Sequence, residues 1–358
     1  MRYLAATLPG FSRSIGLTSR TGRCAFAALV GWVMALRGAT AQAQSCTENG
    51  LSTCVDANPL WLPAGPSRFV SVDSESAMHP NALALAAGFQ FISHPIIIRA
   101  PGPDPYGTEV AAVKRALQMD LLGAFGILPR LELTLALPVV ISQNGSGVSS
   151  ATSVAPTPIA STALKDPRIG LGFDLFNEQG DVTLTGKLKY EVSLPLGNDH
   201  AFAGERAVVH APAVAIAARW QEFTFATELG FRLRPQVVLG DTRYGSQLTA
   251  AVGLGFSAID QSRLDLSLEA WAYPSLISQL QTQPSGTVTD ASFAPSEWQL
   301  AVRTSPYPNL LLQLGMGTAI ALSSRTRSTP TGEESREVFS PITAASFRAV
   351  LVARYLLR

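Results

Sequence analysis

The residues best suited to catalysis are four histidines, His79, His94, His200 and His210. A histidine activates a serine or binds a metal only where the sequence also supplies its partner residues. His210 is followed by Ala211-Pro212-Ala213 and therefore lacks the H-x-S-N-G pattern of surface phospholipases; no G-x-S-x-G elbow, zinc-ligand spacing or P-loop occurs either. We expect no catalytic residues, no metal site and no cofactor.

The N-terminus has the pattern of a cleaved export signal. Arginines precede an apolar stretch from Cys24 to Leu36, and motifs with small residues at alternate positions end at Ala41 and Ala43. We predict that residues 1–43 are a signal peptide cleaved after Ala43; a buried core helix is the alternative. Cleavage leaves 22 basic and 26 acidic residues. No basic stripe with interleaved aromatic residues remains, so nucleic-acid binding is not expected.

Two cysteines, Cys46 and Cys54, remain after this cleavage and lie eight positions apart. Because an exported protein meets an oxidising compartment, we predict a disulfide between Cys46 and Cys54. The less favoured alternative is a lipid anchor on Cys46. Lipoprotein signals usually have Leu three residues before the cysteine, and this chain has Ala43 there.

Charged residues make up only 15% of the chain, against about a quarter in soluble domains. Past residue 45, however, no stretch reaches the roughly twenty apolar residues of a membrane helix. Apolar residues instead recur with a two-residue period, as in Leu131, Leu133, Leu135, Leu137, Val139 and Ile141. A β-barrel in a membrane reconciles these observations, because its apolar residues occupy alternate positions of many strands.

The alternation predicts twelve strands, over residues 82–92, 113–127, 130–141, 166–176, 181–194, 208–220, 222–234, 243–258, 262–274, 296–305, 309–322 and 344–357. Short connections alternate with long ones, which cover residues 93–112, 142–165, 195–207, 235–242, 275–295 and 323–343. Outer-membrane barrels have short periplasmic turns and longer extracellular loops. We therefore predict an all-β protein, a closed antiparallel up-and-down transmembrane barrel of about 12 strands over residues 81–358, with both termini in the periplasm.

A soluble sandwich also alternates, but it explains neither the strand length nor the order of the connections. Residues 44–80 are rich in Ser, Pro and Asn and show no sustained period. We expect a periplasmic N-terminal segment there, with the mouth of the barrel as a second location.

In such a barrel the apolar faces contact lipid and the charged faces line the lumen. The basic lumen candidates are Lys114, Arg168, Lys187, Lys189, Arg232, Arg234, Arg263, Arg303, Arg348 and Arg354. The acidic candidates are Asp120, Glu132, Asp174, Glu191, Glu228, Asp265, Glu269 and Glu297. The expected interfacial aromatic residues are Trp220, Phe223, Tyr244, Phe347 and Tyr355. The lumen charges either pair across a narrow, closed lumen or line a water-filled path.

Several stretches resemble strands of large outer-membrane barrels from myxobacteria and related Gram-negative bacteria. They are Leu121–Gly126 with Pro129–Val139, Asp166–Gly172, Val192–Gly197 and Leu229–Pro235. These stretches are similar to the putative transporter family linked to phenol degradation and to the barrels that precede OmpA-like peptidoglycan-binding domains. The resemblance covers about residues 80–358 and implies an outer-membrane barrel without implying a particular substrate.

The sequence therefore predicts an outer-membrane barrel, exported through its signal peptide, that acts as a passive channel or transporter for small solutes. The alternative is a structural or surface-interaction barrel with an ion-paired, closed lumen. An outer-membrane hydrolase is the third and least favoured hypothesis. The expected partners are outer-membrane lipid and small solutes; the sequence leaves the oligomeric state open.

Overall fold

The computed structural model of the chain divides into two compact units, Met1–Gln42 and Ala43–Arg358. The structure describes residues 47–48, 51–100, 108–147, 158–239, 242–259, 264–277, 279–282, 288–291, 294–320 and 344–357, all in the second unit. The predicted signal peptide, Cys46 and Arg263 lie outside the described residues. Within those ranges, no helix is long and apolar enough to cross a membrane.

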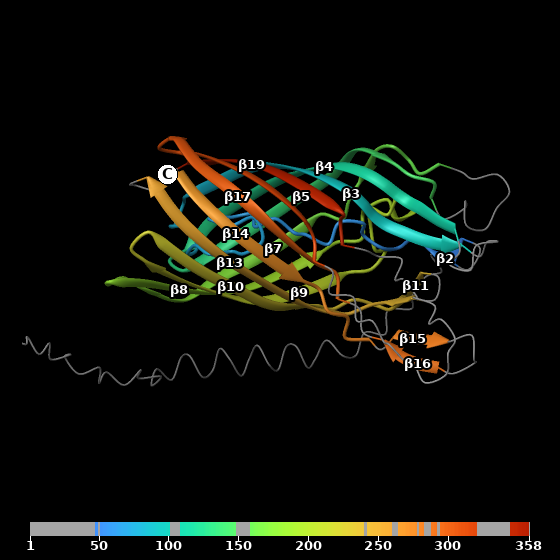
Figure 1. The fold of residues 1–358 in the computed structure, drawn as a ribbon. Helices are drawn as coiled ribbons and strands as arrows, with labels where there is room; N and C mark the ends of the chain where they lie inside the picture. Colours follow the sequence, from blue (N-terminus) through green and yellow to red (C-terminus); the bar gives the residue numbers. More distant parts are fainter. Residues whose placement is uncertain are drawn as a thin grey trace, which may run out of the picture. The chain divides into compact units, whose positions relative to one another are not determined.

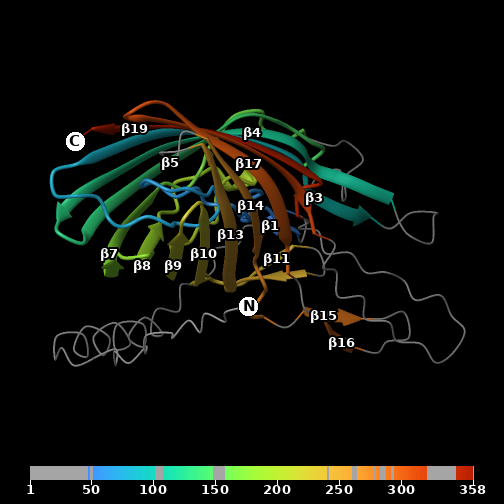
Figure 2. The same cartoon turned by 60° about the vertical axis from the view of Figure 1, so that its left-hand side comes forward.

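Twelve long strands form a closed antiparallel barrel in which each strand pairs with the preceding long strand (Figure 1 and Figure 2). They are β3 (Leu83–Ala100), β4 (Thr108–Leu128), β5 (Leu131–Asn144), β7 (Arg168–Glu178), β8 (Val182–Ser193), β9 (Val209–Trp220), β10 (Phe223–Arg232), β13 (Gln247–Ile259), β14 (Leu264–Ala272), β17 (Ser296–Tyr307), β18 (Leu310–Ala319) and β19 (Phe347–Leu357). The last strand, β19, pairs with β3 from Phe347 opposite Ser93 to Leu357 opposite Leu83, and this pairing closes the ring. The predicted fold class is confirmed.

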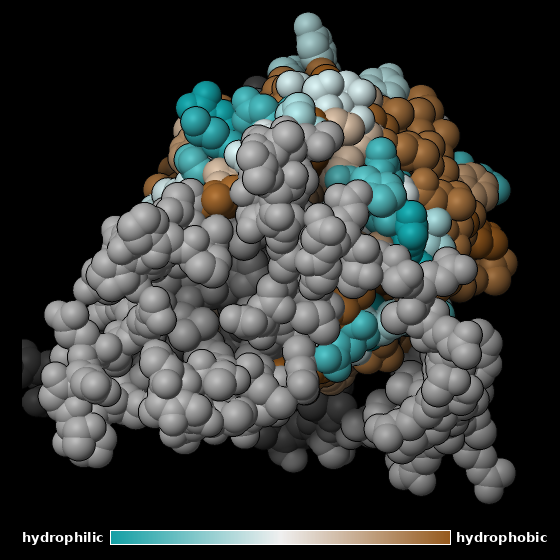
Figure 3. All heavy atoms as spheres, turned by 90° about the vertical axis from the view of Figure 1, so that its right-hand side faces the viewer, coloured by the Kyte–Doolittle hydropathy of each residue, from teal (hydrophilic) through white to brown (hydrophobic). Residues whose placement is uncertain are grey.

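The strands point most of their large apolar side chains outward and their charged side chains, together with many alanines, inward. In β7, Arg168 and Asp174 are 3% and 5% exposed, whereas Leu171 between them is 46% exposed. The same two-residue alternation runs through β5, β10 and β19. Figure 3 shows apolar side chains, in brown, gathered on the flank of the barrel. A soluble protein buries its apolar residues, so this barrel has the opposite arrangement.

The largest departure from the predicted strands concerns the first hairpin. Strands β3 and β4 extend to Ala100 and from Thr108, so much of the predicted loop 93–112 is strand. Strand β3 continues through His94-Pro95, where His94 takes a positive φ of 52° and the register shifts between Ser93 and Ile97. A bulge of this kind accommodates proline in a strand. The bulge also changes the direction in which neighbouring side chains point. Lys114, which the sequence predicts to face the lumen, is exposed.

The two ends of the barrel differ. At one end, which we call the turn end, tight turns such as Pro129-Arg130 and Gln221-Glu222 join the strands. Arg130 and Gln221 have positive φ values of 74° and 52°, as tight hairpin turns require. The opposite end, which we call the loop end, carries the long connections. The short elements in or near them are β6 (Ala163–Leu164), a 3-10 helix (Asp199–Ala201) and two hairpins, β11 (Val237–Leu239) with β12 (Thr242–Tyr244) and β15 (Gln279–Thr282) with β16 (Val288–Ala291).

Residues 53–82, which we call the luminal segment, fill the interior of the barrel, as the blue trace inside the strands in Figure 2 shows. The segment follows a two-stranded hairpin, β1 (Thr47–Glu48) with β2 (Leu51–Ser52). Its side chains of Leu62, Phe69 and Val72 are fully or almost fully buried. The sequence predicts a periplasmic segment or a location at the barrel mouth for residues 44–80, whereas residues 53–82 run through the lumen.

Small inward residues of the strands leave room for the luminal segment. Phe69 lies over Gly253 of β13, where an added Cβ would be 2.6 Å from its ring. Inward alanines, including Ala217 and Ala226, belong to the same buried apolar cluster as Phe69. Because a larger side chain at these positions would occupy the space of the segment, the wall and the segment are complementary in shape.

Candidate functional site

The candidate site is the lumen, where inward positions of the strands meet the luminal segment. The twelve residues of greatest interest from the sequence are Arg168, Lys187, Lys189, Glu191, Glu228, Arg232, Arg234, Asp265, Glu269, Arg303, Arg348 and Arg354. All of them lie on or next to the strands, and nine are buried, whereas Lys189, Glu191 and Glu228 are partly buried. The structure does not gather them in one place; it distributes them over several clusters along the lumen.

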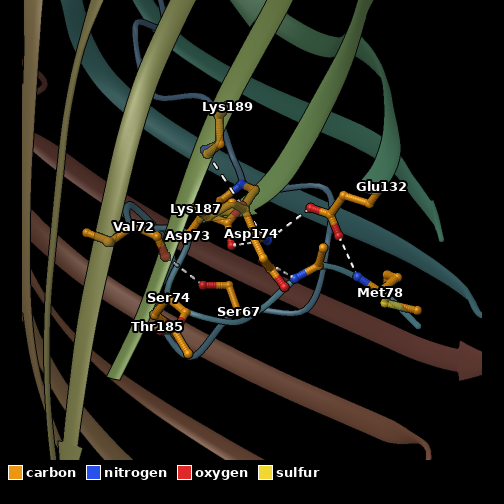
Figure 4. Close-up of polar contacts among 12 residues, drawn as sticks. Ser67, Val72, Asp73, Ser74, Met78, Glu132, Asp174, Thr185, Lys187 and Lys189 are labelled. Carbon is orange, nitrogen blue, oxygen red and sulfur yellow. Dashed lines mark hydrogen bonds and ion pairs between the residues drawn. The ribbon is translucent and has the colours of Figure 1, made fainter. Parts of the chain in front are cut away.

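The most highly charged cluster surrounds Asp73 of the luminal segment (Figure 4). Lys187 Nζ lies 3.2 Å from both carboxylate oxygens of Asp73 and 3.0 Å from Glu132 Oε1. Lys189 Nζ lies 3.2 Å from both oxygens of Glu228, which in turn accepts a hydrogen bond from the Asp73 amide at 3.0 Å. Because Asp73 comes from the segment, its carboxylate joins the segment to the barrel wall.

Wall carboxylates also bind the main chain of the luminal segment. Glu269, with no exposed surface, accepts hydrogen bonds from the amides of Val70 and Ser71 at 2.9 and 2.8 Å and from the Ser71 hydroxyl at 2.7 Å. Further along, Asp174 accepts from the Ala77 amide at 2.8 Å and Glu132 from the Met78 amide at 2.9 Å. These contacts satisfy amides that have no strand partner.

Arginines of the wall bind carbonyl groups of the same segment. Arg354 donates to the carbonyl oxygens of Pro63 and Ser67 at 3.0 and 3.2 Å. Arg303 lies 3.2 Å from Asp265, and Asp265 also pairs with Arg68 of the segment at 3.2 Å. The wall therefore offers acceptors to the amides and donors to the carbonyls of one extended chain.

Nearer the loop end, Arg348 forms two hydrogen bonds with Glu297, at 2.6 and 3.0 Å, and donates to Asn58 Oδ1 at 2.8 Å. The Asn58 amide group donates to Gln118 at 2.8 Å and to Gln90 at 3.1 Å. Wall residues from three strands thus converge on one side chain of the luminal segment.

An aromatic side chain of the segment lies between two arginines. The guanidinium carbons of Arg168 and Arg232 lie 4.5 and 4.1 Å from the ring centre of Trp61, and Arg232 also lies 4.8 Å from the ring centre of Tyr273. Such contacts favour the cation through the negative face of the ring. A cavity of about 60 Å³ adjoins Trp61, Lys189 and Arg232, and it is large enough for a few water molecules.

Two acidic groups order the loop end. Asp166 accepts hydrogen bonds from the amides of Gly197 and Glu205, at 2.7 and 2.8 Å. Burial raises the pKa of Asp166 more than these bonds lower it. Burial likewise raises the pKa of Glu205, against the influence of Arg234, with which it forms an ion pair. Tyr244, expected at a membrane interface, is instead 3% exposed, and Arg234 lies 4.1 Å from its ring centre.

The cysteines and histidines show the following contacts. Cys54 is buried and disulfide-bonded, while the predicted partner Cys46 is not among the described residues. His94 Nδ1 lies 2.8 Å from Ser93 Oγ and 3.4 Å from Ser346 Oγ, a pairing that the sequence motifs did not indicate. In the described ranges, no group of three His, Cys, Asp or Glu residues is arranged to hold a metal ion.

Sequence reasoning found most wall charges but missed their partners. Asn58, Trp61 and Asp73 lie in a stretch without periodicity, so no pattern marked them as lumen residues. The only signal for them was composition. A polar segment directly precedes a barrel whose inward charges need partners, and this segment could supply them.

Comparisons with known proteins give the fold. No protein-family model matches the chain, and no curated protein matches it. Among solved structures, an outer-membrane channel from Pseudomonas putida F1 is similar at a TM-score of 0.53 and 13% identity, covering 79% of this chain and 97% of that one. The NanC porin gives 0.41 at 9% identity (77% and 100%), and outer-membrane phospholipase A from Escherichia coli gives 0.34 at 11% identity (78% and 92%).

Only the first of these similarities is strong enough to support an argument, and at 13% identity it concerns the fold alone. The chain is a closed twelve-stranded antiparallel β-barrel of the kind seen in that channel.

Proposed function

We propose that this chain is an outer-membrane barrel and a passive channel for small solutes, closed at rest by its own luminal segment. A continuous apolar exterior supports the membrane location. Leu229, Leu254, Leu300 and Leu351, from four different strands, are 56%, 50%, 57% and 46% exposed. A transmembrane strand needs about 9–11 residues, and each of the twelve strands has at least nine. A closed barrel also pairs its backbone groups internally, as a bilayer requires.

Aromatic residues at the turn end support the same location. Trp220 and Phe223 flank the β9–β10 turn and are 54% and 46% exposed, and Tyr307 beside the β17–β18 turn is 69% exposed. Exposed aromatic rings at one level of a barrel are typical of the interface between lipid and water. We propose that the turn end faces the periplasm and the loop end the cell exterior. Export through a cleaved signal peptide, residues 1–43, is part of this proposal.

One observation carries the channel proposal: much of the space inside the charged wall is occupied by a segment that precedes the first strand and does not belong to the wall. Alanines and glycines face the segment, and the polar wall groups bind its main chain. Removal of residues 44–80, and with them most of the luminal segment, would leave a polar path lined by both signs of charge, which suits small hydrophilic solutes. The resemblance to the putative transporter family linked to phenol degradation remains a hypothesis and implies no particular solute.

Planar-bilayer recording tests this proposal with two chains: the chain beginning at Gln44, and one from which residues 44–80 are also removed. We expect little conductance from the first and stable current steps from the second. Heat-modifiable gel mobility serves as the control for folding, since a folded barrel migrates differently from its boiled form. Absence of current from the shortened chain after verified insertion would overturn the channel proposal.

The second candidate is a structural barrel with a permanently closed lumen. Ion pairs within the wall favour it, such as Arg348 with Glu297 and Arg168 with Glu191 at 3.3 Å. These pairs would persist without the luminal segment, so this candidate predicts no current from either chain. The contact of His94 with two serines keeps a surface hydrolase as a third candidate. A lipase assay with Ser93→Ala and Ser346→Ala as controls tests it.

A further inference from the structure

The luminal segment crosses the barrel in one direction, from the loop end to the turn end. The first and the last strand of the barrel both meet the turn end. Strand β3 starts there at Leu83, and β19 ends there at Leu357, which pairs with Leu83. A chain that simply preceded β3 would leave the barrel at that end. The luminal segment instead turns back into the lumen.

Contacts at the beginning of the segment lie at the loop end. Asp56 pairs with Lys165, which precedes β7, at 2.8 Å. The Ala57 amide donates to the carbonyl of Phe202, in the connection between β8 and β9, at 3.0 Å. Just before the segment, strand β2 contacts β11, and Figure 1 shows both at the opposite end of the barrel from the C-terminus.

Contacts at the other end of the segment lie beside the turn between β4 and β5. The Asn81 amide donates to the carbonyl of Gly126 at 2.9 Å, and the Gly126 amide donates to the carbonyl of Ala82 at 3.0 Å. Met78 and Ala82 pack with Ala124 and Leu356, near the ends of β4 and β19. Between the two ends, successive contacts of Asn58, Pro63, Val70, Asp73 and Met78 with the wall follow the segment through the lumen.

We infer that the amino end of the mature chain emerges at the cell surface, so that the two ends of the mature protein lie on opposite sides of the outer membrane. The inference rests on the proposed outer-membrane location with the loop end outside. It then follows from the contacts above, because the β1–β2 hairpin lies at the same end as β11 and Lys165. It replaces the expectation from the sequence that both termini are periplasmic.

Cysteine labelling on intact cells tests this inference with the full-length chain. In a Cys46→Ser/Cys54→Ser background, single cysteines are introduced by Thr47→Cys in β1, Leu196→Cys in the β8–β9 connection and Gln179→Cys in the β7–β8 turn. Leu196 is 64% exposed and Gln179 is exposed. A membrane-impermeant maleimide is applied to intact cells, to permeabilised cells and to denatured protein.

We expect the cysteines at positions 47 and 196 to react in intact cells and the one at position 179 only after permeabilisation. If the cysteine at position 47 reacts only with permeabilised cells or only after denaturation, while positions 196 and 179 behave as expected, the surface location of the amino end is wrong but the barrel orientation stands. If position 179 reacts in intact cells and position 196 does not, the proposed orientation itself is wrong, and the inference falls with it.

Because removal of the cysteines could disturb the segment, a second variant keeps both. It carries a short epitope inserted between Gln44 and Ser45. Antibody binding to intact cells supports the inference, and binding only after permeabilisation overturns it. Heat-modifiable mobility shows for every variant that the barrel is folded.

Discussion

The outward and inward faces of the same strands are stabilised in different ways. The outward face is mainly apolar, and its side chains need only contact lipid, so one apolar side chain can replace another at little cost. On the inward face, most charged side chains have a particular partner in the luminal segment or on a neighbouring strand. The exterior therefore depends on the apolar character of its residues as a group, whereas the lumen depends on specific contacts. Substitutions on the two faces should have different consequences.

The largest expected effect is on the inward face, at Lys187, whose side chain is 2% exposed. Lys187→Met leaves the carboxylates of Asp73 and Glu132 buried without their shared cation. Breaking a buried ion pair on one side costs about 3–5 kcal/mol. The free energy of unfolding in urea, measured in lipid vesicles, should fall by this amount. Adding Glu132→Gln should recover part of the loss, and a fully additive loss would contradict the shared-cation interpretation.

The next effect concerns the outward face. Leu171→Arg places a charge in the middle of β7, where a bilayer midplane position costs about 2–4 kcal/mol. The matched control is Leu196→Arg at the loop end, where the side chain is already 64% exposed and solvated. The same urea experiment should separate the two variants. Equal stability of both would mean that the outer face of β7 does not contact lipid.

A smaller effect is expected where a carboxylate binds the segment without a basic partner. Glu269→Gln loses the charge that strengthens the bonds from Val70 and Ser71, and such charge-assisted bonds contribute about 1.5–3 kcal/mol. Brief current openings should also become more frequent in bilayer recordings of the full mature chain. Glu191→Gln, at a partly exposed ion pair, should cost less than about 1 kcal/mol. If the two variants behave alike, main-chain binding by Glu269 is not what holds the segment.

The smallest effect is a pH dependence of the loop end. Because burial raises the pKa of Asp166, the ordered loop binds its proton more tightly than the disordered loop does. This contribution to ordering is fully present below the ordinary pKa of 3.8 and is lost as the pH rises through the raised value. Limited proteolysis of the β8–β9 connection should therefore slow on acidification. Asp166→Asn should weaken the pH dependence of the proteolysis rate. If the pH dependence is unchanged in this variant, another group is responsible for it.

The sequence predicts the barrel wall well because alternate residues of a strand face the exterior and the lumen and differ in polarity accordingly. The pattern around Leu171 and Arg168 is local, and it specifies strand, face and inward charge together. It fails at Lys114, because the nearby bulge between Ser93 and Ile97 is a property of two paired strands and not of one.

The luminal segment could not be placed from the sequence for a related reason. Its contacts join residues far apart in the chain, such as Val70 with Glu269 and Pro63 with Arg354, and many involve its main chain. A carboxylate that binds an amide does not depend on the side chain of the residue that it binds, so the segment needs no recognisable motif. The inward charges of the wall could be predicted from the sequence, but the segment that occupies the lumen and binds them could not.

The direct continuity of Ala82 with Leu83 makes the luminal segment a tethered ligand of its own barrel. Attachment of this kind gives effective concentrations in the millimolar range. A segment that left the lumen would therefore return before a dilute competitor could replace it, and dilution of the protein would not release it. The tether also keeps the turn end of the segment in place, so opening should begin at the loop end, where the segment is not continuous with a strand of the wall.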